Sequence, residues 1–215
     1  MQVNTQKVLG LTFIHLLVFL VWAGITANAQ TTTPLHWGVK AGINASTMHG
    51  DAVDDAEYQA GFNGGIYLNY KFAQNWSIQP EVLFSMKGAE TESSLSGQAI
   101  TTDYELGYLS IPVLAKYHFN TNSNVIPSLY LGPQLGFGLY GDANDNEIDD
   151  SLADAEFGLA FGGGIDLLTA SQASDLIQLV GLDLRYTLGL TDTFDVAGDP
   201  EAQNGAFSAV FTLGF

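Results

Sequence analysis

The stretch Trp76–Lys87, WSIQPEVLFSMK, alternates between apolar and polar residues along its whole length. Its even positions are apolar and its odd positions are polar, with Leu83 as the exception. Successive side chains of a β-strand point to opposite faces, so this period of two predicts a strand with one apolar and one polar face. The polar face carries Glu81 and Lys87. These charges need water, hydrogen bonds or opposite charges around them, whereas the apolar face does not.

Seven other segments have a similar strand-like character, and turn residues separate them. Together with the first, they cover residues 36–48, 58–72, 76–88, 104–119, 126–140, 155–169, 176–190 and 206–215. They are about 10 to 16 residues long, whereas globular strands average about 5–6 residues and a tilted strand of about 9–11 crosses a bilayer. The pattern predicts an all-β fold, a closed antiparallel eight-stranded up-and-down transmembrane β-barrel.

The segment at residues 155–169 indicates which face of the barrel meets lipid. One face is bulky and apolar and carries Phe157, Leu159, Phe161, Ile165 and Leu167. The other face is almost empty and carries Gly158, Ala160, Gly162 and Gly164. An empty face suits the interior of a narrow barrel, and a bulky apolar face suits lipid. The alternative is a soluble lipocalin-like barrel in the periplasm, with its apolar residues inward and its charges outward.

The composition of the 215-residue chain excludes several classes of protein. Charged residues make up 13% of it, about half of the roughly 25% found in globular domains. The formal net charge is −17, so the chain has no basic patch for nucleic acid. There is no cysteine, which excludes disulfides and thiolate zinc sites.

Residues 1–29 have the features of a cleaved secretory signal peptide. Lys7 precedes the apolar run Val8–Ile25, and Ala27-Asn28-Ala29 supplies a small-x-small cleavage pattern. The alternative is a transmembrane anchor, although an apolar run of this length is at the short end of what spans a bilayer. We expect residues 30–215 to form the outer-membrane barrel domain.

The connections between the segments alternate in length. The short ones are Ala73–Asn75, Asn120–Asn124 and Ala170–Asp175, and the long ones are His49–Glu57, Ala89–Thr102, Gly141–Asp150 and Thr191–Asn204. Outer-membrane barrels have short periplasmic turns and long external loops, so we expect both termini in the periplasm. Fifteen of the 23 acidic residues lie in the long connections: Asp51, Asp54, Asp55, Glu57, Glu90, Glu92, Asp142, Asp145, Glu147, Asp149, Asp150, Asp192, Asp195, Asp199 and Glu201.

The basic residues that follow the signal all lie in strand segments. The alternation predicts that they face the lumen together with three acids, which gives a polar network of Lys40, Lys71, Glu81, Lys87, Lys116, Asp166, Asp183 and Arg185. A charge on the lipid face costs about 2–4 kcal/mol at the midplane, so inward placement is favoured. Eight strands leave room for little more than side chains, so we expect a structural plug and not an ion path.

Six features occur in order along the chain: Gly38–Asn44, Ser77–Gly88, Tyr108–Tyr117, Gly132–Gln134, Leu184–Asp192 and the closing Phe215. Together they resemble the PorT-like outer-membrane β-barrel proteins of the Bacteroidetes. One departure is Ser110, which stands where members often carry an acid before Ile-Pro of the fourth strand. The resemblance implies an outer-membrane barrel, and the family name comes from a component linked to a protein-secretion system.

The sequence offers only weak candidates for chemistry. His49, next to Asp51 and near Ser46 and Thr47, is the best catalytic base, but a single histidine at the rim is more often solvated. An oxygen-rich loop is a weak calcium candidate, formed by Asp142, Asp145, Glu147, Asp149 and Asp150. It lacks the central glycine and terminal glutamate of an EF-hand. We therefore expect no catalytic residue, cofactor or resident metal.

These observations predict a small non-enzymatic barrel with a filled lumen and acidic external loops, and with a structural or interaction role in the cell envelope. Its expected partners are outer-membrane lipid, lipopolysaccharide and envelope proteins, and we expect a monomer. The alternatives are an accessory component of a surface protein-secretion or envelope-assembly complex and a lipid-modifying enzyme acting at the rim.

Overall fold

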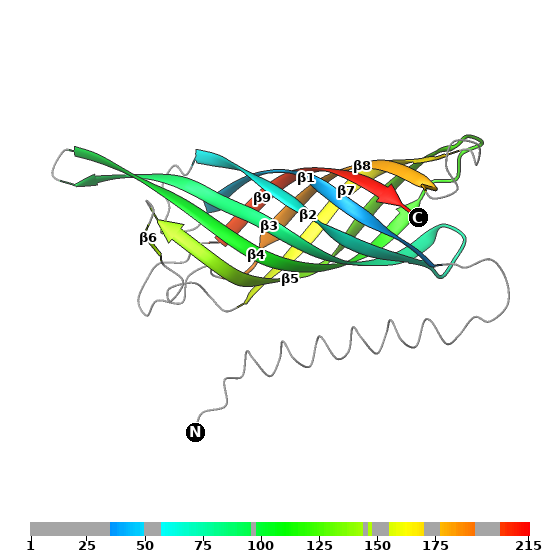
Figure 1. The fold of residues 1–215 in the computed structure, drawn as a ribbon, viewed down its shortest axis with the longest axis horizontal. Helices are drawn as coiled ribbons and strands as arrows, with labels where there is room; N and C mark the ends of the chain where they lie inside the picture. The colour runs from blue at the N-terminus through cyan, green and yellow to red at the C-terminus, as the bar shows by residue number, and fades with distance from the viewer. Residues whose placement is uncertain are drawn as a thin grey trace, which may run out of the picture.

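The computed structural model describes residues 35–49, 57–95, 98–143, 146–147, 155–169, 177–191 and 203–215. Within them the chain forms eight long strands: β1 (Leu35–His49), β2 (Glu57–Lys71), β3 (Trp76–Leu95), β4 (Gln98–His118), β5 (Val125–Ala143), β7 (Glu156–Leu168), β8 (Leu179–Gly189) and β9 (Gln203–Gly214). A two-residue strand, β6 (Asn146–Glu147), follows β5. The long strands wind around one axis as a barrel (Figure 1). No helix among the described residues is long and apolar enough to cross a membrane.

Antiparallel pairing joins each long strand to the next long strand along the chain, and β1 also pairs with β9. Lys40 of β1, for example, lies opposite Gly65 of β2 on one side and Thr212 of β9 on the other. β4 also pairs with β5, which completes the ring. A closed ring leaves no strand edge in the lipid, which a spanning sheet requires. The predicted closed, eight-stranded antiparallel barrel is confirmed.

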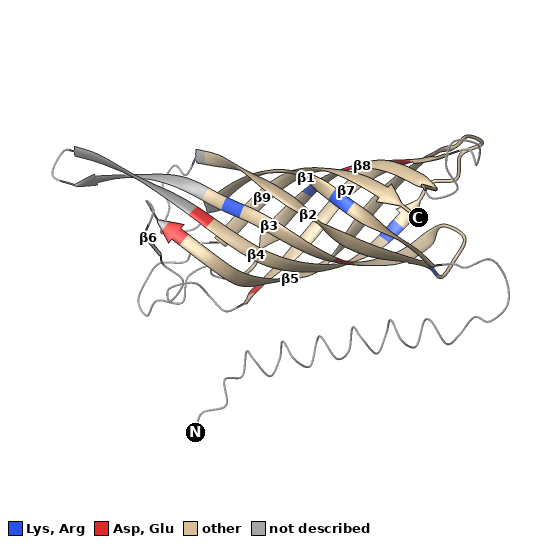
Figure 2. Cartoon of the chain, in the orientation of Figure 1, with Lys and Arg blue, Asp and Glu red and all other residues tan. Residues whose placement is uncertain are grey.

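The exterior and interior of the barrel are inverted relative to a soluble protein. On β8 the outward Leu184 is 63% exposed, whereas its neighbour Arg185 is 5% exposed. On β1 the outward Ile43 is 68% exposed and Asn44 is 3% exposed. Figure 2 shows the consequence, a barrel wall that is mostly uncharged with isolated charged positions. This arrangement contradicts the soluble lipocalin-like alternative, which requires apolar residues inside.

Glycine on β7 makes room inside the barrel for large polar groups from other strands. A Cβ placed on Gly162 would lie 2.8 Å from the hydroxyl of Tyr130 and 3.0 Å from Cα of Arg185. The empty face recognised in the sequence is therefore the lumen face, and its emptiness gives the Tyr130 phenol and the adjacent backbone of β8 their space.

The two ends of the barrel differ. We call the end that carries the connections 72–75, 119–124 and 169–178 the turn end, and the opposite end the loop end. β1 begins and β9 finishes at the turn end, where the backbone N–H of Phe215 donates a hydrogen bond to the carbonyl of Trp37 at 2.8 Å. Aromatic side chains cluster on the outside of this end. The ring centroids of Trp37 and Phe215 are 4.8 Å apart, and those of Trp76 and Tyr117 are 5.0 Å apart. Such a girdle is typical of a membrane–water interface.

One expected loop is a hairpin instead. The sequence predicts a long connection at Ala89–Thr102, but β3 and β4 stay paired through Thr91↔Thr102 as far as Leu95↔Gln98. The segment is rich in threonine and serine and includes β-branched Ile100, and a hairpin needs only about two residues to turn. The pairing of β3 with β2 ends at Glu90, and the pairing of β4 with β5 ends at Tyr104. The hairpin therefore projects beyond the neighbouring strands (Figure 1).

A second expected loop is also partly ordered as strand. In the segment Gly141–Asp150, β5 continues to Ala143 and pairs with β6, with Asp142 opposite Glu147. Five of the acids assigned to long connections therefore belong to strands, where they remain at the loop end: Glu57, Glu90, Glu92, Asp142 and Glu147.

Candidate functional site

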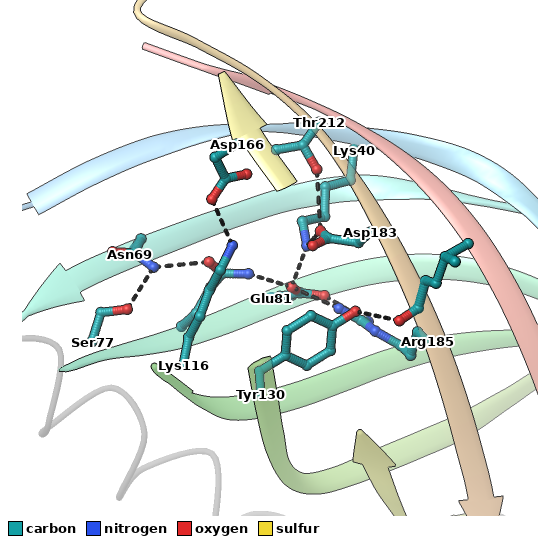
Figure 3. A network of polar contacts seen from close by, with 12 residues as sticks. Lys40, Asn69, Ser77, Glu81, Lys116, Tyr130, Asp166, Asp183, Arg185 and Thr212 are labelled. Atoms are coloured by element: carbon teal, nitrogen blue, oxygen red, sulfur yellow. Dashed lines mark hydrogen bonds and ion pairs between the residues drawn. The ribbon is translucent and has the colours of Figure 1, made fainter. Parts of the chain in front are cut away.

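A carboxylate stands at the centre of the lumen and holds two cations from other strands. Glu81 of β3 lies 2.8 Å from Nζ of Lys40 on β1. The guanidinium of Arg185 on β8 binds the same carboxylate with both terminal nitrogens, at 2.8 and 2.9 Å. These side chains meet because each occupies an inward position of its strand (Figure 3). The Glu81 side chain has no exposed area, so these bonds stand in place of water.

The central cluster extends to a second carboxylate. Lys40 also lies 2.8 Å from Oδ2 of Asp183, and Thr212 of β9 donates its hydroxyl to that oxygen at 3.3 Å. Tyr130 of β5 donates its hydroxyl to the carbonyl of Leu184 at 3.3 Å, below the guanidinium (Figure 3). The cluster therefore ties β1, β3, β5, β8 and β9 together across the lumen.

A chain of amides runs from Glu81 towards the turn end. Gln79 donates to the Glu81 carboxylate at 2.8 Å, and Asn69 donates to the Gln79 side-chain oxygen at 2.8 Å. Asn69 donates again to the hydroxyl of Ser77 at 2.9 Å, and Ser77 lies 2.9 Å from Nε2 of His118. The bonds from Asn69 to Gln79 and from Gln79 to Glu81 both run towards the central acid, so these two amides help to neutralise its charge.

A separate ion pair lies beside this chain. Lys116 of β4 binds Asp166 of β7 at 3.0 Å, and both side chains are buried. β4 and β7 flank β5 in the ring, so this ion pair bridges over the inner face of β5. Figure 3 shows the pair next to the central cluster and on its turn-end side.

A further cluster closes the lumen towards the loop end. Lys87 lies 2.8 Å from Glu156 of β7 and 4.4 Å above the ring of Tyr108, which has no exposed area. Asn204 of β9 donates to the other oxygen of Glu156 and to the Tyr108 hydroxyl. Between this cluster and the centre, Asn44 donates to Ser85 at 3.0 Å and accepts from other side chains.

The structure brings together most of the predicted lumen residues, with one exception and several additions. Lys40, Glu81, Lys87, Lys116, Asp166, Asp183 and Arg185 are all buried and ion-paired. Lys71 is the exception: the alternation of β2 assigns it to the inward face, but its side chain is exposed at the turn end. Sequence reasoning missed Glu156, Tyr108 and Asn204, although Glu156 has the same parity on β7 as Asp166.

A cavity opens from the central cluster to the turn end, and we call it the turn-end vestibule. Its volume is about 490 Å³. Lys40 and Gln79 lie at its inner part, and His36, Lys71 and His118 are among the residues that line it. The lumen is therefore blocked by side chains in its middle and its loop-end half, and hollow at the turn end.

The weaker candidates for chemistry gain no support from the described residues. Asp145, Asp149 and Asp150 of the calcium candidate lie outside them, as do the side chains of Glu147 and His49. In the part of the chain that is described, no group of three or more His, Asp or Glu side chains is arranged to hold a metal ion.

Comparison with known proteins agrees with this architecture. The family model for the outer membrane protein beta-barrel domain matches residues 28–195. No curated protein matches the chain. Among solved structures, Neisserial surface protein A shares 20% identity over 83% of this chain and 97% of its own, with a TM-score of 0.49.

Two other similar structures are Ail of Yersinia pestis, in complex with the heparin analogue sucrose octasulfate, and OprG from Pseudomonas aeruginosa. Ail shares 16% identity over 85% of this chain and all of its own, with a TM-score of 0.45. OprG shares 14% identity over 84% of this chain and 94% of its own, with a TM-score of 0.47. The family match covers more than half of a chain whose strands close into a ring with apolar residues outward, and the chain accordingly belongs to the outer membrane protein β-barrel domain family of the bacterial outer membrane.

Proposed function

We propose that this protein is a sealed, non-enzymatic outer-membrane barrel with a structural or interaction role in the cell envelope. The observation that carries the proposal is the buried, ion-paired filling of the lumen. The central cluster and the loop-end cluster are stacked along the axis, and their ionic side chains are almost fully buried. Opening a path would separate ion pairs in a poorly hydrated interior, where each unpaired ion costs several kcal/mol. A rigid, filled barrel is suited to presenting its ends to other molecules.

The partition of charge supports an interaction role at the loop end. Fifteen of the 23 acids belong to the four segments at that end, whereas four of the five cations in the strands are held in lumen ion pairs. We place the turn end and both termini in the periplasm and the acidic loop end outside the cell, by analogy with the usual loop lengths of such barrels. An anionic surface of this kind favours divalent cations and basic partners.

The absence of an enzymatic role is part of the same proposal. A serine–histidine contact does exist, between Ser77 and His118, and such a contact is one requirement of nucleophilic catalysis. Ser77, however, has no exposed area and accepts a hydrogen bond from Asn69, so a substrate carbonyl has no approach to its oxygen. We therefore assign this contact to the structural amide chain.

The projecting β3–β4 hairpin favours a second candidate function, that of an accessory component of a surface protein-secretion or envelope-assembly complex. The hairpin continues beyond both neighbouring strands, so the pairings of the described residues leave its two outer edges open. Open strand edges are common docking elements. The resemblance to the PorT-like barrels of the Bacteroidetes is the reason to consider a secretion complex.

The sealed-barrel proposal is tested by single-channel recording of the purified full chain in planar bilayers. We expect no conductance steps for the wild type. Glu81→Ala, which removes the acceptor of the central cluster, is expected to give intermittent steps if it still folds. A matched control is Gln134→Ala, which removes a buried lumen side chain without removing a charge. Steady conductance of the wild type would contradict the proposal.

The interaction role is tested by affinity capture from native envelopes in mild detergent. Deletion of residues 92–101 leaves Thr91 and Thr102 as a two-residue turn, because these residues already face each other across the hairpin. Loss of a reproducible partner in this variant, with the barrel intact, would support the accessory role. A change in lipid A or phospholipid composition that depends on the protein would instead support the enzyme alternative and contradict our proposal.

A further inference from the structure

The turn-end vestibule carries an excess of positive charge. Five cations occupy inward positions of the strands, and four of them are paired with Glu81, Asp183, Glu156 or Asp166. Lys71 is the fifth, and no carboxylate among the described residues lies within salt-bridge distance of it. Among the described residues, the unmatched positive charge is therefore at the mouth of the vestibule and not in the plug.

The strand register places the other donors next to Lys71. Lys71 lies opposite Ser77 on β3, and Ser77 lies opposite Lys116 on β4. His118 is two residues further along β4 and therefore points to the same side of the sheet as Lys116. His36, at the start of β1, lies opposite Asn69 of β2. One patch of wall thus brings two imidazoles and an ammonium that has no carboxylate partner in the described part of the chain to the same cavity.

The hydrogen bonds of the vestibule leave donors in surplus. The hydroxyl of Ser77 accepts from Asn69 and lies 2.9 Å from Nε2 of His118. In the tautomer in which Ser77 donates its proton to Nε2, the second ring nitrogen of His118 is a donor. Asp166, which also lines the cavity, is already bound by Lys116 at 3.0 Å. An incoming ligand therefore meets ammonium and imidazole donors and finds the nearby acid occupied.

We propose that the turn-end vestibule is a binding site for a small anion that carries a phosphate or carboxylate group, with Lys71 as its main charged contact. The cavity of about 490 Å³ is within the range of about 300–1,000 Å³ that is typical of small-molecule sites. Multi-oxygen anions match several converging N–H donors. The site is at the opposite end of the barrel from the acidic segments, so the overall charge of −17 does not prevent anion entry at this end. This assignment goes beyond the sealed-barrel proposal and does not depend on it.

The experiment is a titration of the full mature chain with inorganic phosphate, in a neutral maltoside detergent at constant pH and ionic strength. The readout is the set of histidine ring signals in the NMR spectrum. After residue 29 the chain has three histidines, His36, His49 and His118, and His49 lies at the loop end as an internal control. We expect saturable shifts of the His36 and His118 signals and none of the His49 signals.

Variants separate a specific site from general salt effects. Lys71→Gln is expected to weaken phosphate binding on the order of tenfold, because a hydrogen bond to a charged group is lost. Lys71→Arg keeps the charge and should bind nearly as well as the wild type. Gln74→Ala changes an exposed residue of the adjacent turn and is the matched control. Heat-modifiable migration on gels checks that every variant is folded.

A second arm distinguishes a free solute from a lipid headgroup as the source of the anion. The chain is placed in nanodiscs that contain phosphatidylglycerol, without free phosphate. Shifts of His36 and His118 in these discs would assign the site to a headgroup, and shifts only with added phosphate would assign it to a solute. Equal shifts of all three histidines, no saturable shift in either arm, or unchanged binding by Lys71→Gln would overturn the proposal.

Discussion

Replacing Glu81 with glutamine tests whether the central cluster holds the barrel together. Glutamine has nearly the same shape as glutamate but no charge, so the variant removes the charge without leaving a cavity. Lys40 keeps Asp183 at 2.8 Å, whereas Arg185 loses its bidentate carboxylate. The lumen of the variant therefore contains one uncompensated positive charge, and it is located mainly on the guanidinium.

The expected loss of unfolding free energy follows from the contacts of this carboxylate. Glu81 accepts four charge-assisted hydrogen bonds, one from Lys40, two from Arg185 and one from Gln79, at 2.8 to 2.9 Å. Each such bond is worth about 1.5–3 kcal/mol, but shared bonds do not add, and Lys40 retains a partner. Removing one member of a buried pair typically costs about 3–5 kcal/mol, and we expect a loss in that range.

The measurement is reversible urea unfolding in lipid vesicles, followed by tryptophan fluorescence and by heat-modifiable gel migration. The double variant Glu81→Gln/Arg185→Gln restores charge balance, so it should lose clearly less than the sum of the two single variants. Lys87→Gln, in the loop-end cluster, serves as the control and should add to Glu81→Gln without coupling. A loss below about 1 kcal/mol for Glu81→Gln, with no coupling to Arg185→Gln, would refute the idea that this cluster stabilises the fold.

Three further predictions concern the wall of the barrel. Gly162→Val should lower stability by about 1–3 kcal/mol, because its Cβ would overlap the backbone carbonyl of Leu184 and crowd the hydroxyl of Tyr130. Gly136→Ala, whose added Cβ has no neighbour closer than 3.4 Å, should change stability little in the same unfolding assay. Leu184→Arg should cost about 2–4 kcal/mol in vesicles, because it puts a charge on the lipid face, and a neutral effect would contradict the assigned face. Lipids brominated near the glycerol should quench Trp37 and Trp76 more than lipids brominated at the chain end, and the reverse order would contradict an interfacial girdle.

The alternation of side chains made the strands and their faces predictable. In Trp76–Lys87 and in the segment 155–169 the period of two survives in the sequence because lipid outside and a polar lumen inside impose opposite demands on neighbouring residues. Strand starts and ends were predicted to within a few residues where turn residues are dense, as at 72–75. The hairpin at residues 89–102 was wrongly predicted as a loop, because serine- and threonine-rich segments occur in both structures and only the pairing of β3 with β4 decides between them.

The candidate site was predictable in its residue types and not in its pairing. Parity placed Glu81, Asp183 and Arg185 on the lumen face, since a charge on the lipid face is costly. Glu156 was missed because it is the first residue of its strand. The alternation of apolar and polar residues cannot be followed on the side that precedes it, so its face was not assigned. The position of Lys71 at an open mouth could not be read from parity, which gives the face of a strand but not the depth along the barrel.

By itself, therefore, the sequence determined that the chain forms a barrel of alternating strands with bulky apolar residues towards lipid and charges inside. This much is local, because each residue's face follows from the residues beside it. Only the tertiary structure decided which strands lie across the lumen from one another. That arrangement makes Glu81 the partner of Lys40 and Arg185 and joins Lys87 to Glu156. It also leaves the cavity at one end, together with Lys71, which has no ion-pair partner in the described ranges. Such contacts depend on the closure and stagger of the whole ring, which no single segment encodes.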